Sequence, residues 1–239
     1  MSERIVVVTG AGSGIGHATA ALFHDLGDTV YGLDVSGAAP EGVDLIACDV
    51  SSKETVERVI GEIGERHGRI DVLANVAGIV QFGRFETVSE QQLDAVFAVN
   101  AKGPFLLIQA ALPYLKACRG NVVNVSSVAG NVGQPYSAAY SASKGALTML
   151  TRSLAVELAP DRVRVNAVCP GTVDTPLVAA VAENYPTDLD PTIQQLLFGL
   201  MPGKPSSPAE VGSAIVYLAS PEARTVTGAV LAIDGGMAA

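Results

Sequence analysis

The sequence predicts a doubly wound α/β fold, in which helices cover both faces of a seven-stranded parallel sheet. Short apolar runs rich in β-branched residues alternate along the chain with longer stretches of helical period. Most of these runs are continuously apolar, which is typical of parallel strands buried on both faces. The predicted strands span residues 4–8, 29–33, 45–48, 70–74, 122–126, 163–168 and 230–233.

Helical spacing of apolar residues separates these strands. Two ends carry local signals: Gly27 follows the first helix as a C-terminal glycine, and Ser207 precedes Pro208 as an N-terminal cap. A strand–helix alternation of this regularity implies right-handed crossovers between parallel strands. The predicted helices span residues 16–26, 52–67, 89–115, 138–158 and 208–218.

The length and the distribution of Gly and Pro indicate a single domain over residues 1–239. A chain of 239 residues suits one large α/β domain better than two small ones. One irregular stretch, residues 173–207, contains five prolines among apolar pieces. A stretch of this length inside a domain is more often functional than a linker, so we expect a lid there.

Composition excludes several classes of function. The net charge of −9 and the absence of Trp argue against nucleic-acid binding, which needs a basic surface and stacking platforms. No apolar run approaches the roughly 20 residues of a membrane-spanning helix, and the N-terminal run is too short for a signal peptide. We therefore expect a soluble, cytoplasmic protein with no nucleic-acid or membrane partner.

The cysteines and histidines do not predict a metal site. Cys48, Cys118 and Cys169 are widely spaced, which suggests small buried thiols in a reducing compartment. The three histidines all precede residue 68 and do not cluster with cysteines at metal-ligand spacing. We expect no metal.

A glycine-rich segment follows the first strand and opens the first helix. Its glycines stand as G-x-x-x-G-x-G at Gly10, Gly14 and Gly16, with Ser13 and Ile15 between them. Such a loop lets the backbone approach a pyrophosphate, which the free N–H groups of the helix N-terminus attract. The segment predicts a dinucleotide site; an ordinary glycine-rich turn is the alternative.

Asp34 closes the second strand, 20 residues after Gly14, where an acidic residue binds the hydroxyls of an adenosine ribose. A 2′-phosphate beside this carboxylate would be repelled by about 4 kcal/mol at about 4 Å. Neither Lys nor Arg follows it, and His17 stands where a basic residue would have helped. NAD is therefore favoured over NADP; a strand-end Asp that caps a loop is the alternative.

Two more segments end strands at the same edge of the sheet, where ligands gather in open α/β folds. Asp49-Val50 follows the third strand, and Asn75-Val76-Ala77-Gly78 follows the fourth. Taken alone, each is equally compatible with an ordinary turn.

The sharpest chemical feature is Tyr140 with Lys144, four residues apart on a predicted helix. This spacing puts both side chains on one face, and a nearby ammonium is expected to lower the tyrosine pKa toward neutrality. Tyr140 is then a candidate acid or base. Ser127 ends the fifth strand 13 residues earlier, and no His lies beyond residue 67 to activate it, so it suits hydrogen bonding rather than nucleophilic attack.

These residues resemble the classical short-chain dehydrogenase/reductase family over nearly the whole chain. The matching motifs, in order, are TGxxxGxG at 9–16, DV at 49–50, NVAG at 75–78, Asn100 in VNAKG, Ser127, YSASK at 140–144, RVNAVCPG at 164–171 and IDGG at 233–236. Val76 is the one departure, because the family usually has a second Asn there.

The resemblance implies a Rossmann fold of seven parallel strands and a catalytic tetrad of Asn100, Ser127, Tyr140 and Lys144. In this family the tyrosine exchanges a proton with the substrate oxygen, which the serine hydrogen-bonds. The lysine holds the nicotinamide ribose and lowers the tyrosine pKa, and the asparagine supports a proton relay. Other implied cofactor contacts are Gly78 and the loop residues Pro170, Gly171, Val173 and Thr175. The family commonly forms homotetramers or homodimers.

The expected substrate is an uncharged secondary alcohol or ketone of moderate size, because the expected pocket is mostly apolar. Arg84 and Lys204 are expected to be solvated rather than paired with an anion. The alternatives are an NADPH-dependent 3-oxoacyl-thioester reductase and a non-catalytic dinucleotide sensor. The expected pocket residues are Ile79, Val80, Gln81, Phe82, residues 130–136, Leu177, Val178, Val181, Tyr185, Leu196, Leu197, Phe198 and Met201.

Overall fold

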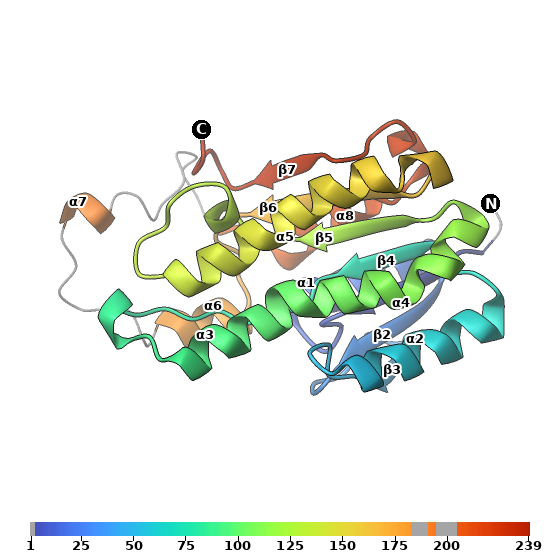
Figure 1. Ribbon diagram of the computed structural model, residues 1–239, viewed down its shortest axis with the longest axis horizontal. Helices are drawn as coiled ribbons and strands as arrows, with labels where there is room; N and C mark the ends of the chain where they lie inside the picture. The colour runs from blue at the N-terminus through green and yellow to red at the C-terminus, as the bar shows by residue number, and fades with distance from the viewer. Residues whose placement is uncertain (1–2, 183–190, 195–204) are drawn as a thin grey trace.

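Seven parallel strands form one sheet in the computed structural model, which describes residues 3–182, 191–194 and 205–239 (Figure 1). The strand order is β3-β2-β1-β4-β5-β6-β7, so the chain reverses its winding direction between β1 and β4. The predicted fold class and all seven predicted strands are confirmed. The strands are β1 (Ile5–Thr9), β2 (Thr29–Asp34), β3 (Asp44–Ala47), β4 (Val72–Asn75), β5 (Asn121–Val125), β6 (Arg164–Pro170) and β7 (Val230–Ile233).

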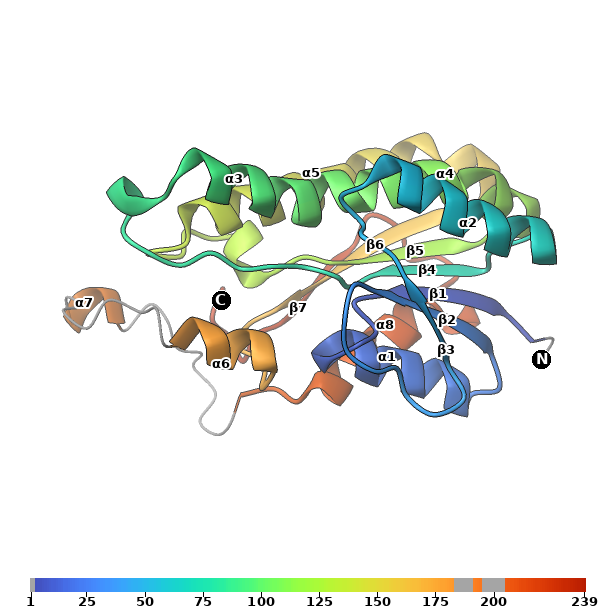
Figure 2. The ribbon, with the colours of Figure 1, turned by 90° about the horizontal axis from the view of Figure 1, so that it is seen from below.

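Helices cover both faces of the sheet (Figure 2). On one face lie α2 (Lys53–His67), α4 (Gly103–Cys118) and α5 (Ala138–Glu157), and on the other lie α1 (Gly14–Asp25) and α8 (Pro208–Leu218). Each face has its own apolar core. The first includes Ile60, Leu73, Leu107 and Leu115, and the second includes Val6, Phe23, Ile215 and Leu218.

Burial follows position in the sheet rather than strand composition. Every residue of β1, β4 and β5 is buried, as their apolar runs predict. The four residues of β3 are exposed or partly exposed, because this strand lies at the edge of the sheet. The expectation of burial on both faces therefore holds for β1, β4 and β5, and it fails for both edge strands, since the residues of β7 are exposed or partly exposed as well.

The predicted helix over residues 89–115 contains a change of helical type. It comprises α3 (Glu90–Phe97), a π-helical turn at Ala98–Lys102, and α4. This continuous helix, Glu90–Cys118, is the one candidate among the described residues that is long and apolar enough to cross a membrane. Several apolar residues of α4 belong to the core on the sheet, so that side of the helix covers the sheet.

The two ends of the predicted lid lie side by side. Val173 and Ser206 form an isolated parallel bridge, and the Asp174 N–H donates to the Ser206 carbonyl over 2.9 Å. Between them the chain forms α6 (Pro176–Ala182) and α7 (Pro191–Gln194). The side chain of Val181 and the predicted pocket or surface residues Tyr185, Leu196, Leu197, Phe198, Met201 and Lys204 lie outside the described residues.

Candidate active site

The loop between β1 and α1 needs glycine at several positions. Gly10 and Gly14 have φ angles of +71° and +52°, which L side chains rarely adopt. A Cβ on Gly16 would lie 2.1 Å from the Gly10 carbonyl oxygen. Ser13 precedes α1, but its side chain caps none of the helix N–H groups. The N–H groups at the start of α1 thus have no cap from the Ser13 side chain, and a helix terminus of this kind is suited to an anion.

Thr9 fastens this loop to the end of β4. Its Oγ1 accepts hydrogen bonds from the N–H groups of Val76 (2.9 Å) and Ala77 (3.0 Å). A Cβ on Gly10 would lie only 3.0 Å from Ala77 Cα. The glycine loop and the segment after β4 therefore approach closely where the winding of the sheet reverses, which is the usual ligand position in open α/β sheets.

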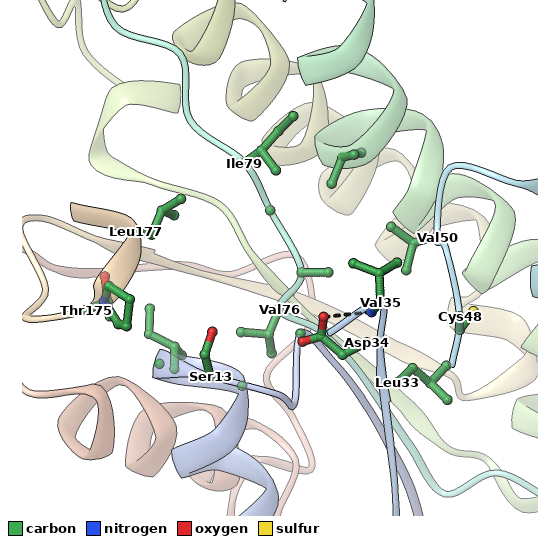
Figure 3. Close-up of a pocket in the computed structure, with 18 of the residues that line it drawn as sticks. Ser13, Leu33, Asp34, Val35, Cys48, Val50, Val76, Ile79, Thr175 and Leu177 are labelled. Atoms are coloured by element: carbon green, nitrogen blue, oxygen red, sulfur yellow. Dashed lines mark hydrogen bonds between the residues drawn. The ribbon is translucent and has the colours of Figure 1, made fainter. Parts of the chain in front are cut away.

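A cleft of about 360 Å³ opens at this edge of the sheet (Figure 3). Asp34, Val35, Cys48 and Val50 lie on one side of it, and Thr175 and Leu177 lie opposite. The predicted residues that line it are Gly10, Ser13, Gly14, Ile15, Gly16, Asp34, Asp49, Val50, Ala77, Gly78 and Thr175. Sequence order alone does not place these residues together, and the structure does.

Asp34 is held by the backbone around it. Its Oδ1 accepts hydrogen bonds from the N–H groups of Val35 (2.7 Å) and Ser36 (3.2 Å), and its Oδ2 accepts one from Gly12 (2.9 Å). Gly12 was not among the predicted site residues. Its signal in the sequence is a fourth glycine at a motif position that the family leaves open.

Asp49 also lines the cleft, but its carboxylate is engaged locally. Its Oδ1 accepts from both the N–H (2.9 Å) and the hydroxyl (2.7 Å) of Ser51, just before α2 begins. Burial and the Asp49 charge raise the pKa of the neighbouring Cys48 thiol. Cys48 is therefore a neutral, apolar part of the wall rather than a reactive group.

The side chain of Asn75 turns into the core of the sheet. Its Nδ2 donates to Asn124 Oδ1 over 2.8 Å, and Asn124 in turn donates to Thr151 Oγ1 over 2.9 Å. Asn75 is 2% exposed, and its Oδ1 has no hydrogen-bond partner. This side chain ties β4 to β5 and α5 beneath the site, while the next residues, Val76 to Gly78, line the cleft itself.

A second cavity of about 100 Å³ continues the cleft to the predicted catalytic residues. It is lined by Ser127, Tyr140 and Lys144, and by Pro170, Gly171 and Val173 from the end of β6 and the loop after it. The two cavities together form one elongated cleft from Asp34 to Tyr140. Their shared lining residues are Ile15, Val76, Gly78, Ile79, Thr175 and Leu177.

Tyr140 and Lys144 lie on one face of α5, as their spacing predicts. Lys144 Nζ is 5.8 Å from the centroid of the Tyr140 ring and donates to the Val125 carbonyl over 2.8 Å. Lys144 is 3% exposed, and burial lowers its pKa to about 8. Ser127 lies just after the end of β5, and its Oγ accepts a hydrogen bond from the Ala129 N–H.

The expectation that the pKa of Tyr140 falls toward neutrality is wrong for the protein alone. Burial raises the pKa of Tyr140 above its ordinary value of 10.0, and the hydrogen bond with Ser127 offsets only part of that effect. The spacing argument considered the Lys144 charge and omitted desolvation of the phenolate, which here is the larger influence.

Asn100 lies in the π-helical turn and is fully buried. Its amide clamps the Ile79 backbone: Oδ1 accepts from the Ile79 N–H (2.9 Å), and Nδ2 donates to the Ile79 carbonyl (2.8 Å). Nδ2 also donates to Ser143 Oγ, whose hydroxyl donates to the Tyr140 carbonyl. Asn100 thus connects the segment after β4 to the helix that carries Tyr140.

The loop after β6 is held by the C-terminal segment. Gly171 donates its N–H to the Ile233 carbonyl over 2.9 Å, and a Cβ on it would lie 3.0 Å from Asp234 Cα. Thr175 then reaches across to the glycine loop, since a Cβ on Gly14 would lie 3.2 Å from its Cγ2. This loop forms the wall of the cleft opposite Asp34.

The walls nearest Tyr140 are mostly apolar among the residues that the structure describes. Ile79, Leu177 and Val178 line them and are exposed. Farther out, Arg84 lies over the Tyr136 ring at 6.0 Å from its centroid, beside a separate cavity of about 400 Å³. Within the described ranges no cluster of His, Cys, Asp or Glu has the makeup of a metal site.

The sequence and the fold of this chain are similar to those of many known proteins. A family model described as enoyl-(acyl carrier protein) reductase matches residues 10–238. The 3-oxoacyl-[acyl-carrier-protein] reductase FabG of Thermotoga maritima is 37% identical, and the match covers 99% of this chain and 98% of that protein.

Two solved structures are similar along nearly the whole chain. Ligand-free aldohexose dehydrogenase of Thermoplasma acidophilum has a TM-score of 0.88 and 37% identity, over 98% of this chain and 94% of that one. The 3-ketoacyl-(acyl-carrier-protein) reductase of Brucella melitensis, complexed with NADH, has a TM-score of 0.86 and 28% identity, over 99% and 98%.

Proposed function

The chain belongs to the short-chain dehydrogenase/reductase family and is an NAD(P)-dependent oxidoreductase, and we propose that it transfers hydride between NAD(H) and a secondary alcohol or ketone. The observation that carries this proposal is the elongated cleft, which has Asp34 at one end and Tyr140 at the other. Its two cavities share six lining residues, so the glycine loop and the Tyr140 side chain line adjoining parts of it.

The residues of the cleft fit a dinucleotide. The glycines lack the Cβ atoms that would fill the cradle, and the start of α1 offers N–H groups to a pyrophosphate. Asp34 would accept hydrogen bonds from ribose hydroxyls, with Asp49 and Val50 beyond it. Ala77, Gly78, Pro170, Gly171, Val173 and Thr175 would surround the nicotinamide half. When bound, NAD⁺ would accept the hydride and NADH would donate it.

Side chains of the protein would donate a proton to the substrate oxygen or accept one from it. We assign Tyr140 as general acid/base: its phenol donates a proton to the carbonyl oxygen during reduction, and its phenolate accepts the hydroxyl proton during oxidation. Ser127 would hydrogen-bond the same oxygen. Lys144, with a pKa of about 8, would bind the nicotinamide ribose. Asn100 would support proton relay by holding the Ile79 segment and α5.

The substrate class follows from the walls around Tyr140. Apolar side chains there favour an uncharged, moderately sized secondary alcohol or ketone. Residues 173–207 would close over it as a lid within the single domain 1–239. We further propose a cytoplasmic homotetramer or homodimer, with exposed Phe105, Met149 and Val156 on α4 and α5 as candidate contacts.

A second candidate is reduction of 3-oxoacyl thioesters with NADPH. It is favoured by the similarity to the Thermotoga maritima and Brucella melitensis reductases. The Asp34 carboxylate counts against NADPH because it would repel a 2′-phosphate. The structure of the Brucella melitensis reductase contains NADH, so a 3-ketoacyl-(acyl-carrier-protein) reductase of this fold can bind NADH.

Thermal shift and turnover test the proposal together. NADH should raise Tm more than NADPH, because at equal concentration the ligand that binds the native state more tightly stabilises it more. A panel of secondary alcohols, ketones and a 3-oxoacyl thioester, followed by NADH absorbance, should then show turnover with the uncharged substrates. Preference for the thioester with NADPH would support the second candidate, and binding without any turnover would support a dinucleotide sensor.

A further inference from the structure

Both carboxylate oxygens of Asp34 are engaged by backbone donors from two segments. Val35 and Ser36 donate to Oδ1 from the strand end itself, whereas Gly12 donates to Oδ2 from the glycine loop. Rotation of the carboxylate about its own axis would break at least one of these bonds. The direction in which its remaining lone pairs face the cleft is therefore set by how these two segments meet.

Gly12 allows the two segments to meet because it has no side chain. A Cβ at this position would lie 2.1 Å from the Ser36 carbonyl oxygen and 2.9 Å from Asp34 Oδ2. Both distances are far inside van der Waals contact, and the first involves backbone that cannot move alone. Any larger residue at position 12 has to displace Ser36, Asp34 or both.

Gly37 completes the contact from the other side. Its φ angle is +88°, and a Cβ on it would lie 2.5 Å from the Gly12 carbonyl oxygen. That carbonyl also accepts a weak 3.4 Å hydrogen bond from the Ala38 N–H. Residues 36–38 are thus packed onto Gly12, and the turn that places them there requires glycine.

No cationic side chain among the described residues lines the cleft near Asp34, so the orientation of its carboxylate matters for cofactor binding. No Lys or Arg lies between Arg4 and Lys53 in the sequence. The described residues that line the wide part of the cleft include two carboxylates, Asp34 and Asp49, and no cationic side chain. Of the two, Asp34 is the carboxylate that the glycine loop contacts, through the Gly12 N–H, so we assign selection at the ribose to Asp34.

We propose that Gly12 and Gly37 are positioning residues for cofactor selectivity: they seat residues 36–38 on the glycine loop and so hold Asp34 where it binds ribose hydroxyls and repels a 2′-phosphate. This inference rests on the proposed preference for NAD(H). It assigns selectivity to a contact between two loops and not to the Asp34 charge alone. A purely structural role would weaken both cofactors equally, whereas positioning changes their ratio.

Calorimetric titration of NADH and of NADPH into each purified variant gives that ratio. Wild-type protein should bind NADH more tightly. Gly12→Ala and Gly37→Ala should each reduce the NADH/NADPH affinity ratio by about tenfold or more, since the carboxylate would repel a 2′-phosphate less and would bind the ribose hydroxyls less well once it is displaced. Asp34→Asn should reduce the ratio as well. Adding Gly12→Ala to Asp34→Asn should reduce it no further, because the glycine acts through the carboxylate.

Two control variants separate this effect from backbone strain and from helix changes. Gly27→Ala puts a Cβ at a φ of +81° with no atom within 4 Å, and Gly61→Ala adds a Cβ in equally open space on α2. Both should keep the wild-type ratio. If Gly12→Ala does not fold, Gly37→Ala carries the comparison against Gly27→Ala.

Two results would overturn the inference. The first is an unchanged ratio in Gly12→Ala and Gly37→Ala, including the case in which both cofactors weaken equally. The second is that the Gly12→Ala and Asp34→Asn effects on the ratio add. An NADH-selective wild type with either of these results removes the inference and leaves the proposed function intact. A wild type that binds NADPH as tightly as NADH removes the cofactor preference and the inference together.

Discussion

Lys144 follows Tyr140 by one turn of α5, and its Nζ lies 5.8 Å from the centroid of the tyrosine ring. Burial acts on the two groups in opposite directions, raising the pKa of the phenol and lowering that of the ammonium to about 8. At neutral pH the pair therefore holds a protonated phenol beside a lysine that is still mostly charged. This state is ready to donate a proton to a ketone oxygen.

Removal of the Tyr140 hydroxyl tests its role as the proton carrier. Tyr140→Phe should lower kcat by about 10²–10⁴-fold, the usual contribution of general acid–base catalysis, while NADH affinity and Tm stay near wild type. Tyr217→Phe, at a half-exposed position on α8, is the matched control and should keep full activity. Turnover retained by Tyr140→Phe would exclude Tyr140 as the acid/base.

The raised pKa of Tyr140 predicts opposite pH dependences for the two reaction directions. Alcohol oxidation needs the phenolate and should accelerate toward alkaline pH, whereas ketone reduction needs the phenol and should slow. Ser127→Ala removes the hydrogen bond that lowers this pKa, so it should move both profiles to higher pH. Profiles of kcat/KM measure this. Ser213→Ala, on the exposed side of α8, serves as control, and identical profiles for Ser127→Ala and wild type would refute the assignment.

The lowered pKa of Lys144 predicts how the free energy of unfolding changes between about pH 8 and 9.5. Its native pKa of about 8 lies below the ordinary lysine value of 10.5, so in this range the unfolded chain binds more protons than the native protein. The burial cost of the ammonium is present below pH 8 and is relieved as pH rises. The free energy of unfolding should therefore rise with pH relative to Lys144→Met, by at most about 1.4 kcal/mol per pH unit.

Urea unfolding of both proteins across this range measures the difference. The range stops below 10 because the raised pKa of Tyr140 has the opposite sign: above its unfolded value, the native state holds the extra proton and stability falls. A difference between wild type and Lys144→Met that does not change with pH would show that the native pKa of Lys144 is not lowered.

Local sequence patterns were sufficient for the sheet, the glycine loop and the pairing of Tyr140 with Lys144. Apolar runs, glycine spacing and a four-residue interval each follow from one stretch of chain, and the structure places them as expected. The family resemblance supplied Asn100. Its position in a π-helical turn, which aims its amide at Ile79, is not encoded in helical period, because α3 and α4 share one continuous apolar pattern.

The features that sequence reasoning missed depend on contacts between distant segments. Gly12 matters because residues 36–38 pack on it, and Asn75 turns inward because Asn124 on the neighbouring strand accepts its amide hydrogen. The predicted direction of the Tyr140 pKa shift was also wrong, since desolvation of the phenol depends on which residues the fold packs around it. Each of these is a property of tertiary packing that spacing does not contain.

The hydrogen bonds that link Asn75, Asn124 and Thr151 beneath the site predict that replacing Asn124 lowers the stability of the protein substantially. Asn124 is fully buried, accepts from Asn75 Nδ2 and donates to Thr151 Oγ1. Asn124→Leu would leave the Asn75 donor unpaired beside an Oδ1 that already lacks a partner. We expect a loss of about 2–4 kcal/mol in the free energy of unfolding, measured by urea denaturation. A loss below about 0.5 kcal/mol would show that this network is not important for stability.

Two glycines one turn apart on α2 predict effects of opposite sign. A Cβ on Gly64 would lie 2.2 Å from Cε2 of the Tyr114 ring on α4, whereas one on Gly61 would meet no atom within 4 Å. Gly64→Ala should therefore destabilise the protein by about 1–3 kcal/mol through overpacking. Gly61→Ala should stabilise it by about 0.5–1 kcal/mol, because alanine favours the helix.

A Tyr114→Ala background separates overpacking against the ring from an effect that arises within α2. In a Tyr114→Ala background the ring is absent, so Gly64→Ala should become stabilising, like Gly61→Ala in the wild type. Urea unfolding of the four proteins in the Gly64/Tyr114 cycle measures the coupling. If Gly64→Ala destabilised both backgrounds equally, the cost would arise within α2, and the close approach of α2 to α4 would not explain the glycine.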